Sequence, residues 1–250
     1  MAKTENEPFV FGLLGRNISY SFSKAYFTQK FQDMGLASHS YVNFDLPKIE
    51  SFADILHQDK HIKGLNVTIP YKEAIIPFLD DLDEKAKKIG AVNTIKLKDG
   101  TLIGYNTDSY GFEKSLVPLL KPHHKKALIL GTGGASKAVA YVFETLEIPY
   151  VFVSRNASTQ CITYDALDKN IMETHTIIVN CTPLGTYPNI EDKPEIPYAF
   201  ISESHLLFDL IYNPEKTAFL NEGVQRGAVI CNGLKMLQLQ AEKAWDIWNS

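Results

Sequence analysis

A glycine-rich segment between an apolar strand and a helix constrains the fold of this chain more than any other feature. Residues 127–130 (Ala-Leu-Ile-Leu) are typical of a short buried strand, and they run directly into Gly131-Thr132-Gly133-Gly134. Small and apolar residues at helical spacing follow over 135–146. The order of strand, glycine turn and helix is typical of the first segment of a dinucleotide-binding sheet.

The glycines of this turn have separate physical roles. Gly131 permits a tight turn, and Gly133 lets the backbone approach a pyrophosphate, whose charge then lies at the helix N-terminus. The third position of the pattern is Ser136, which is small but not glycine. A Walker A phosphate loop is excluded because it requires glycine at that position. Ordinary turn glycines are the alternative interpretation, and the flanking strand and helix favour a nucleotide site.

The residues after the next predicted strand, 150–153, indicate which dinucleotide would bind. An NAD site places an acidic residue for the ribose hydroxyls about 20 residues beyond the turn. Here the strand is followed by Ser154-Arg155-Asn156. A guanidinium can pair with a 2′-phosphate through charge-assisted hydrogen bonds, whereas an acid would repel it. The position therefore favours NADP over NAD, and a surface arginine at a strand end is the alternative.

The remaining periodicity predicts an α/β protein of two domains. Further strands are expected at 176–179, 206–210 and 228–231, and their separation by helical segments indicates a doubly wound parallel sheet. We expect a Rossmann-like NADP-binding domain at 108–232. An α/β substrate-binding domain is expected at 1–107, and a C-terminal helix within 233–250 would return to it.

The first domain has a more mixed pattern. A strand is predicted at 9–14, a helix at 23–34, and a strand at 65–69 with Leu65, Val67 and Ile69 on one face. Asp99-Gly100 predicts a hairpin turn between strands 91–97 and 101–105.

Composition excludes several classes of function. With 250 residues, 45% apolar residues and a formal charge of −4, the chain has enough apolar sequence for one or two cores and shows no basic stripe for nucleic acid. No apolar run approaches the roughly 18 residues of a membrane span, and the N-terminus does not resemble a secretory signal. Three separated cysteines without a C-x-x-C motif support neither a metal site nor a disulfide framework. We expect a cytoplasmic protein with no nucleic-acid or membrane partner.

Eight segments, taken together and in order, resemble the shikimate dehydrogenase family. The resemblance covers nearly the whole chain. The segments are Ser21-Phe22-Ser23, 66–72 (NVTIPYK), 90–94 (GAVNT), 106–108 (NTD), 131–136 (GTGGAS), 180–185 (NCTPLG), 209–214 (DLIYNP) and 232–237 (NGLKML).

The resemblance implies an enzyme that reversibly reduces 3-dehydroshikimate to shikimate with NADPH, in the shikimate pathway of aromatic amino-acid biosynthesis. It implies Lys72 as the group that exchanges a proton with the substrate oxygen, and Asp108 as the carboxylate that holds the ammonium. Without the resemblance, Lys72 would be interpreted as a solvent-facing lysine and Asp108 as a helix N-cap.

The family also implies binding residues. The substrate set is Ser21, Ser23, Asn66, Thr68, Asn93, Tyr212 and Gln240, with the two serines gripping a carboxylate. The cofactor set is Gly131, Gly133, Gly134, Ala135, Ser154, Arg155, Asn156, Thr182, Leu210 and Gly233, with NADP(H) as the cofactor. An exposed helix position is the alternative for Gln240. The expected partner is a small-molecule substrate, with the chain a monomer or a homodimer.

Some positions depart from the family pattern, and two other functions stay open. Lys24 follows Ser23 where the family usually has proline, and Ser154-Arg155-Asn156 stands for the usual Asn-Arg-Thr. The first alternative function is a quinate/shikimate dehydrogenase with looser substrate and cofactor choice. The second is an NADP(H)-binding sensor without catalysis, against which Lys72 and Asp108 argue.

Overall fold

The computed structural model describes residues 8–19, 21–159 and 161–250, which form two compact units. The first unit contains the described residues up to Thr107 together with Ala241–Ser250, and the second is Asp108–Gln240. The division thus lies at Thr107/Asp108, and the chain passes back to the first unit inside the C-terminal helix α8 (Leu234–Asn249) rather than at its start. The assignment of the units to substrate and cofactor stays a prediction.

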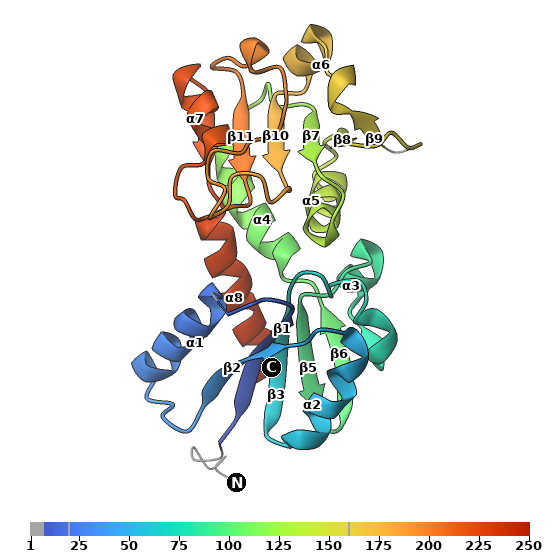
Figure 1. The fold of residues 1–250 in the computed structure, drawn as a ribbon, viewed down its shortest axis with the longest axis vertical. Coiled ribbons are helices and arrows are strands. Elements are labelled where there is room, and N and C mark those ends of the chain that lie inside the picture. The colour runs from blue at the N-terminus through green and yellow to red at the C-terminus, as the bar shows by residue number, and fades with distance from the viewer. Residues whose placement is uncertain (1–7, 20, 160) are drawn as a thin grey trace. The chain divides into compact units, whose positions relative to one another are not determined.

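The first unit is built on a six-stranded mixed sheet (Figure 1). Its order is β2-β1-β3-β5-β6-β4, with β1 parallel to both neighbours and β5 antiparallel to both of its own. The strands are β1 (Val10–Gly15), β2 (Ser40–Asp45), β3 (Ile62–Val67), β4 (Asp81–Leu82), β5 (Thr94–Lys98) and β6 (Thr101–Tyr105). The predicted hairpin is confirmed: Asp99 and Gly100 have φ of 51° and 80°, the left-handed geometry of a two-residue turn.

Two cores cover the two faces of this sheet because successive side chains of β1 point to opposite sides. Phe11 and Leu13 pack with α1 and the end of α8, whereas Leu14 packs with α2 and α3. The helical segments of this unit are α1 (Phe22–Asp33), η1 (Ile49–Ser51), α2 (Phe52–Gln58), η2 (Ile76–Phe78) and α3 (Glu84–Ile89).

Helix α8 reaches the first sheet closely because β3 has a glycine at the contact. A Cβ on Gly64 would lie 2.2 Å from the Trp248 ring, and the Trp248 indole Nε1 donates to the Ile95 carbonyl at 3.0 Å. Ala241 and Ala244 are buried in the same core. The expected return of the C-terminal helix to the first unit is therefore confirmed for the part of α8 that begins at Ala241.

The second unit has a six-stranded, fully parallel sheet of order β12-β11-β10-β7-β8-β9. The strands are β7 (Ala127–Leu130), β8 (Tyr150–Ser154), β9 (Cys161–Thr163), β10 (Ile177–Asn180), β11 (Leu206–Asp209) and β12 (Val229–Cys231). Two parallel halves diverge from β7, which is the arrangement of a Rossmann sheet. The predicted fold class is confirmed.

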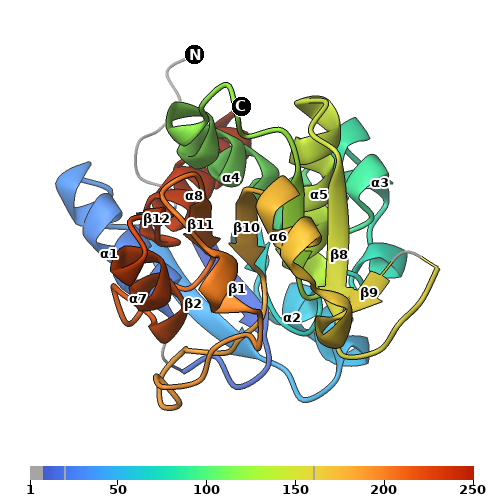
Figure 2. The same ribbon diagram turned by 90° about the horizontal axis from the view of Figure 1, so that it is seen from above.

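Helices cover both faces of this sheet, as Figure 2 shows for α4 and α7 on opposite sides of β11. Ile129 and Val179 pack with α4, α5 and the start of α8, whereas Leu128 and Ile178 pack with α6 and α7. The helical segments are α4 (Asp108–Leu116), η3 (Val117–Leu119), α5 (Gly134–Thr145), η4 (Tyr164–Ala166), α6 (Lys169–Thr174), η5 (Tyr198–Phe200) and α7 (Ala218–Gln225).

The predicted end of the strand at 65–69 is wrong. The strand predicted at 65–69 ends at Val67, and Ile69 is 73% exposed rather than facing inward with Leu65 and Val67. The chain turns at Ile69 and Pro70, where the Tyr71 N–H donates to the Thr68 carbonyl at 2.9 Å, so the alternation of the strand no longer applies. In the part of the chain that the structure describes, no helix is both long and apolar enough to cross a membrane.

Candidate active site

Ser21 and Ser23 lie at the start of helix α1. Ser21 is the N-cap, and its Oγ accepts a hydrogen bond from the Ser23 N–H at 3.2 Å. Ser23 is buried and interacts with the hydroxyl of Tyr41 from strand β2. Burial raises the pKa of Tyr41, and the hydrogen bond with Ser23 lowers it to a smaller extent, so the phenol stays protonated.

Tyr41 connects these serines to a buried amide on strand β3. Its hydroxyl donates to Asn66 Oδ1 at 2.8 Å. Asn66 Nδ2 in turn donates to the Asn93 carbonyl at 3.4 Å and to Thr94 Oγ1 at 3.3 Å. Both ends of the Asn66 amide are therefore engaged inside the first unit.

Asn93 lies just before β5 and holds the segment that leaves β6. Its Oδ1 accepts the Thr107 N–H at 2.7 Å, and its Nδ2 donates to Thr107 Oγ1 at 2.9 Å. Thr107 is 1% exposed and is followed directly by Asp108, the first residue of α4. The Asn93 amide thus orients the peptide from which the buried Asp108 extends.

Lys72 lies in the turn after β3, and its backbone is tied to the same region. Its carbonyl accepts the Val92 N–H at 2.7 Å, so the Lys72 peptide lies beside the residue that precedes Asn93. Asn93 then contacts Thr107, one residue before Asp108. Two hydrogen-bonded contacts, joined by the Val92–Asn93 and Thr107–Asp108 peptide bonds, therefore connect the Lys72 backbone with Asp108, and the pairing of the two side chains stays a prediction.

Thr68 approaches β1 at a position where only glycine fits. A Cβ on Gly15 would lie 2.6 Å from Thr68 Cγ2, and the Thr68 N–H donates to the Leu14 carbonyl at 2.9 Å. Thr68 is half-buried at the end of β3, two residues after Asn66. The first unit thus contains six of the predicted residues: Ser21, Ser23, Asn66, Thr68, Lys72 and Asn93.

The glycine turn of the second unit lies between β7 and α5, as the sequence predicted. Gly131 has a φ of 100°, which favours glycine, and its N–H donates to the Val153 carbonyl at 2.8 Å. Gly133 is the N-cap of α5, and a Cβ there would meet nothing within 4 Å. Ser136, at the third position of the pattern, is fully buried, and its Oγ donates to the Gly133 carbonyl at 2.6 Å. A small residue suffices at this position because it packs the helix on the strand.

The other predicted cofactor residues lie at the carboxyl ends of neighbouring strands. Ser154 ends β8 and is followed by the exposed Arg155 and Asn156. Thr182 follows β10, and its Cγ2 would lie 3.1 Å from a Cβ on Gly131. Gly233 packs on the Leu210 carbonyl, which would lie 2.1 Å from a Cβ on Gly233. The carboxyl edge of one sheet thus brings together the predicted cofactor set, with Gly134 and Ala135 opening α5.

This edge fits a phosphorylated dinucleotide. The turn and the α5 N-terminus offer backbone N–H groups to a pyrophosphate, with open space at Gly133. Arg155 lies on the β8 side of the turn, and Thr182 and Leu210 lie on the β10 and β11 side. That the 2′-phosphate lies near Arg155 and the nicotinamide toward Thr182 and Leu210 stays a prediction.

Gln240 and Tyr212 also belong to the second unit. Gln240 is 8% exposed on α8, which excludes the exposed-helix alternative, and its Nε2 donates to the Leu237 carbonyl at 2.9 Å. A Cβ on Gly111 would lie 3.2 Å from the Gln240 Cβ, so α4 and α8 are closely packed there. Tyr212 follows β11 and is half-buried.

Several polar residues in these clusters were not singled out from the sequence. Tyr41, Thr94 and Thr107 complete the network of the first unit, and Asn180 and Asp209 form another at the ends of β10 and β11. Burial raises the pKa of Asp209 to about 6, although hydrogen bonds from Thr217, Ile211 and Asn180 act in the opposite direction. Asn180 and Asp209 lie inside motifs already recognised, and their position at strand ends was the available signal. Among the described residues, no cluster of His, Cys, Asp or Glu could hold a metal ion.

Comparison with known proteins gives consistent matches. Residues 13–95 match the family model described as "Shikimate dehydrogenase substrate binding domain". The chain is 37% identical over 247 residues to the "Shikimate dehydrogenase (NADP(+))" of Clostridium botulinum, a match that covers 95% of each chain.

Solved structures extend the similarity to the whole fold. Shikimate 5-dehydrogenase from Thermus thermophilus, solved in complex with NADP(H) and shikimate, superposes with a TM-score of 0.85 at 29% identity, over 96% of this chain and 93% of that chain. The 5-ketofructose reductase of Gluconobacter sp. strain CHM43 superposes with a TM-score of 0.79 at 28% identity, over 97% and 93% of the two chains.

Proposed function

Because the chain belongs to the shikimate dehydrogenase family, we propose that it catalyses the NADP-dependent, reversible reduction of 3-dehydroshikimate to shikimate, in the shikimate pathway of aromatic amino-acid biosynthesis. Its relative from C. botulinum, matched over 95% of both chains, is named for this activity with NADP(+). The observation that carries the proposal is a pair of contacts around Asn93. The Lys72 carbonyl accepts the Val92 N–H, and the side chain of the next residue, Asn93, binds Thr107, which directly precedes Asp108.

Lys72 and Asp108 are proposed to manage the proton. When bound, NADPH supplies a hydride to the carbonyl carbon of the substrate, whose oxygen then needs a proton. The Lys72 ammonium donates that proton in the reductive direction, and the Lys72 amine accepts it in the reverse direction. The Asp108 carboxylate holds the ammonium in place. Acid–base assistance of this kind contributes about 10²–10⁴ in rate.

The first unit is proposed to bind the substrate ring. Ser21 and Ser23 lie in the cap and first turn of α1, where hydroxyl and N–H donors favour a carboxylate. Thr68 directly follows β3, the strand that contains Asn66. The side-chain amide of Asn93 can donate to and accept from ring hydroxyls. Asn66, which is bonded to Tyr41 and Thr94, fixes the relative positions of β2, β3 and β5 under this site. Tyr212 and Gln240 of the second unit complete the proposed substrate set.

The second unit is proposed to bind NADP(H). The backbone of Gly131, Gly133, Gly134 and Ala135 receives the pyrophosphate, and Arg155, flanked by Ser154 and Asn156, pairs with the 2′-phosphate. The described segment 154–159 contains no acidic residue that would repel this phosphate. Thr182, Leu210 and Gly233 hold the nicotinamide half.

A substrate and cofactor panel on the purified protein tests this proposal. Initial rates are followed by NADPH absorbance with shikimate or quinate as the alcohol, and with 3-dehydroshikimate or 5-ketofructose as the ketone, each with NADP(H) or NAD(H). We expect the highest kcat/KM for the shikimate pair with NADP(H). A higher value for quinate or 5-ketofructose would replace the substrate assignment, the latter because a similar fold serves the Gluconobacter reductase. Binding of NADP+ without any turnover would support the sensor.

A further inference from the structure

A buried polar pair lies at the carboxyl ends of two neighbouring strands in the second unit. Asn180 ends β10 and Asp209 ends β11, and the two residues are paired in the sheet register. Both are fully buried, and Asn180 Nδ2 donates to Asp209 Oδ1 at 3.1 Å. Buried polar groups of this kind are costly unless they are bonded, so their partners define the local structure.

Asn180 fixes the backbone that follows β10. Its Oδ1 accepts the Thr182 N–H at 3.0 Å and the Thr182 hydroxyl at 2.6 Å. Its own carbonyl accepts the Leu210 N–H at 3.0 Å. A single side chain therefore orients Thr182, and the same residue's backbone orients the start of the loop after β11.

Asp209 orients the Asn180 amide and the loop after β11 together. Besides the Asn180 amide, Asp209 Oδ1 accepts the Ile211 N–H at 3.0 Å, and Oδ2 accepts the Thr217 hydroxyl at 2.6 Å. With three donors directed at its two oxygens, the Asp209 side chain can adopt few other positions. If this acceptor were removed, the Asn180 amide could turn, and Thr182 would lose its fixed partner.

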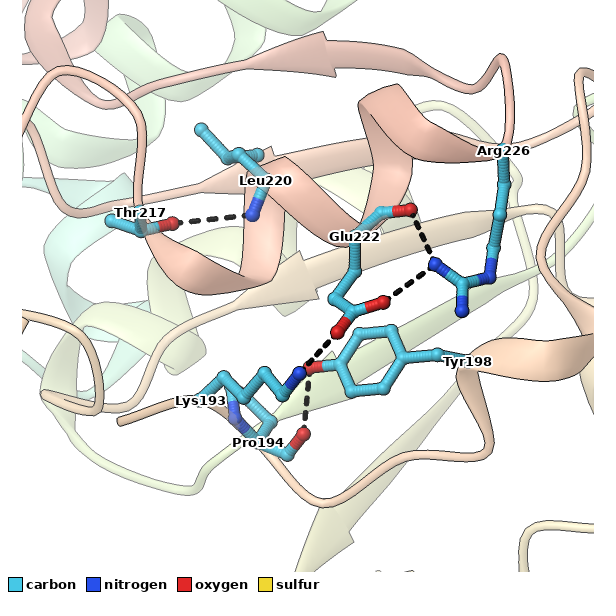
Figure 3. A network of polar contacts seen from close by, with 7 residues as sticks. All are labelled: Lys193, Pro194, Tyr198, Thr217, Leu220, Glu222 and Arg226. Atoms are coloured by element: carbon cyan, nitrogen blue, oxygen red, sulfur yellow. Dashed lines mark hydrogen bonds and ion pairs between the residues drawn. The ribbon is translucent and has the colours of Figure 1, made fainter. Parts of the chain in front are cut away.

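Thr217, which donates to Asp209, also lies at the start of helix α7, and Figure 3 shows it together with a second group of polar contacts around Glu222. Thr217 caps α7 by accepting the Leu220 N–H at 3.3 Å. Further along α7, Glu222 contacts Lys193 and Arg226, and Lys193 lies 4.9 Å from the centroid of the Tyr198 ring. The loop that begins after Asn180 is thus held at its start by Asn180 and at Lys193 by α7.

We propose that Asp209 is a positioning residue for the nicotinamide half of NADP(H). It acts through Asn180 on Thr182, and through its side-chain hydrogen bond with the Ile211 N–H on the loop that begins at Leu210. The inference rests on the proposed function, because it takes Thr182 and Leu210 as cofactor contacts. Arg155 lies on the opposite side of the glycine turn, so the adenosine half does not depend on this pair.

Isothermal titration of two ligands separates these halves. NADP+ contains the nicotinamide, whereas adenosine 2′,5′-bisphosphate contains only the adenosine and 2′-phosphate. Asp209→Ala and Asn180→Ala are each expected to weaken NADP+ and to lower kcat by at least about tenfold, with the affinity for the bisphosphate unchanged within about twofold. Retained bisphosphate binding also reports that the second unit is folded in each variant.

Two further variants act as controls. Asp209→Asn keeps one oxygen that can accept from the Asn180 amide and the Ile211 N–H. Its new amide group can donate to the Thr217 hydroxyl oxygen, so near wild-type NADP+ affinity and kcat are expected. Asp168→Ala removes a cap from α6, where Asp168 accepts the Ile171 N–H at 2.8 Å, and is expected to leave both affinities and kcat unchanged.

The proposal is overturned if the two alanine variants keep wild-type NADP+ affinity and kcat, or weaken both ligands equally. It is also overturned if Asp209→Asn is as defective as Asp209→Ala, since charge rather than the acceptor position would then be responsible. A wild-type chain that bound NADP+ but preferred another substrate would refute the substrate assignment alone, because the comparison of the two ligands requires no turnover of shikimate.

Discussion

The side chain of Asn93 holds Thr107 at two points, with Oδ1 accepting the Thr107 N–H at 2.7 Å and Nδ2 donating to Thr107 Oγ1 at 2.9 Å. Thr107 ends the first unit and Asp108 begins the second, so this amide controls the peptide that carries the proposed catalytic carboxylate. The Thr107 hydroxyl also lies 3.2 Å from Thr94 Oγ1, which places it at the centre of the buried network.

Thr107→Val is expected to lower kcat by about tenfold, because it removes the hydroxyl from this network while keeping the backbone bond to Asn93. The free energy of unfolding should fall by about 1–3 kcal/mol, as is usual when a buried donor loses its partner. Steady-state kinetics and urea unfolding measure the two effects. Thr101→Val, an exposed position on β6, is the matched control and should change neither. Wild-type kcat in Thr107→Val would show that the hydroxyl does not contribute to positioning Asp108.

Lys72→Ala is expected to lower kcat by at least about 10², because the proton on the substrate oxygen would lose its proposed donor and acceptor. The Kd of shikimate should change little, since the serine pair and Thr68 are proposed to supply most of the binding contacts. Kinetics and isothermal titration check the two values. Lys88→Ala, an exposed position near the end of α3, serves as the control. An unaltered kcat would remove Lys72 from the mechanism.

Arg155→Ala is expected to weaken NADP+ by at least about tenfold and to leave NAD+ affinity nearly unchanged, because only NADP+ has a 2′-phosphate for the guanidinium. Titration of both cofactors measures the difference. Lys169→Ala removes an exposed positive charge from the same unit and should affect neither. Equal losses for NADP+ and NAD+ would mean that Arg155 does not distinguish the cofactors.

The stability of the protein is expected to depend on pH through Asp209. Burial raises its pKa from 3.8 to about 6, so between these values the folded state binds a proton that the unfolded state does not. The contribution of this proton to the free energy of unfolding is therefore fully present below pH 3.8 and is lost as pH rises to about 6, a change of about 3 kcal/mol. Urea unfolding from pH 4 to 8 should show that Asp209→Asn gains stability relative to the wild type over this range. A difference that did not change with pH would contradict the raised pKa.

Local sequence patterns predicted much of the second unit. The strand at 127–130, the glycine turn and the following helix agree with β7 and α5 because an apolar run, positive-φ glycines and helical spacing are short-range properties. The hairpin at Asp99-Gly100 was predicted for the same reason. Ile69 was placed wrongly because the end of β3 depends on a turn held by contacts outside that strand.

In the candidate site too, some features could be predicted from local sequence and others depend on contacts between distant segments. Single segments of the sequence, together with the family resemblance, led to the prediction of Lys72, Asn93, Asp108 and Arg155 as site residues. Tertiary structure alone decided that Tyr41 bonds Asn66, that Asn93 holds Thr107, and that Asp209 holds Asn180. These partners are separated by 14 to 29 positions in the chain. Their contacts depend on strand order and register, which arise from packing the whole sheet and have no signature within either segment.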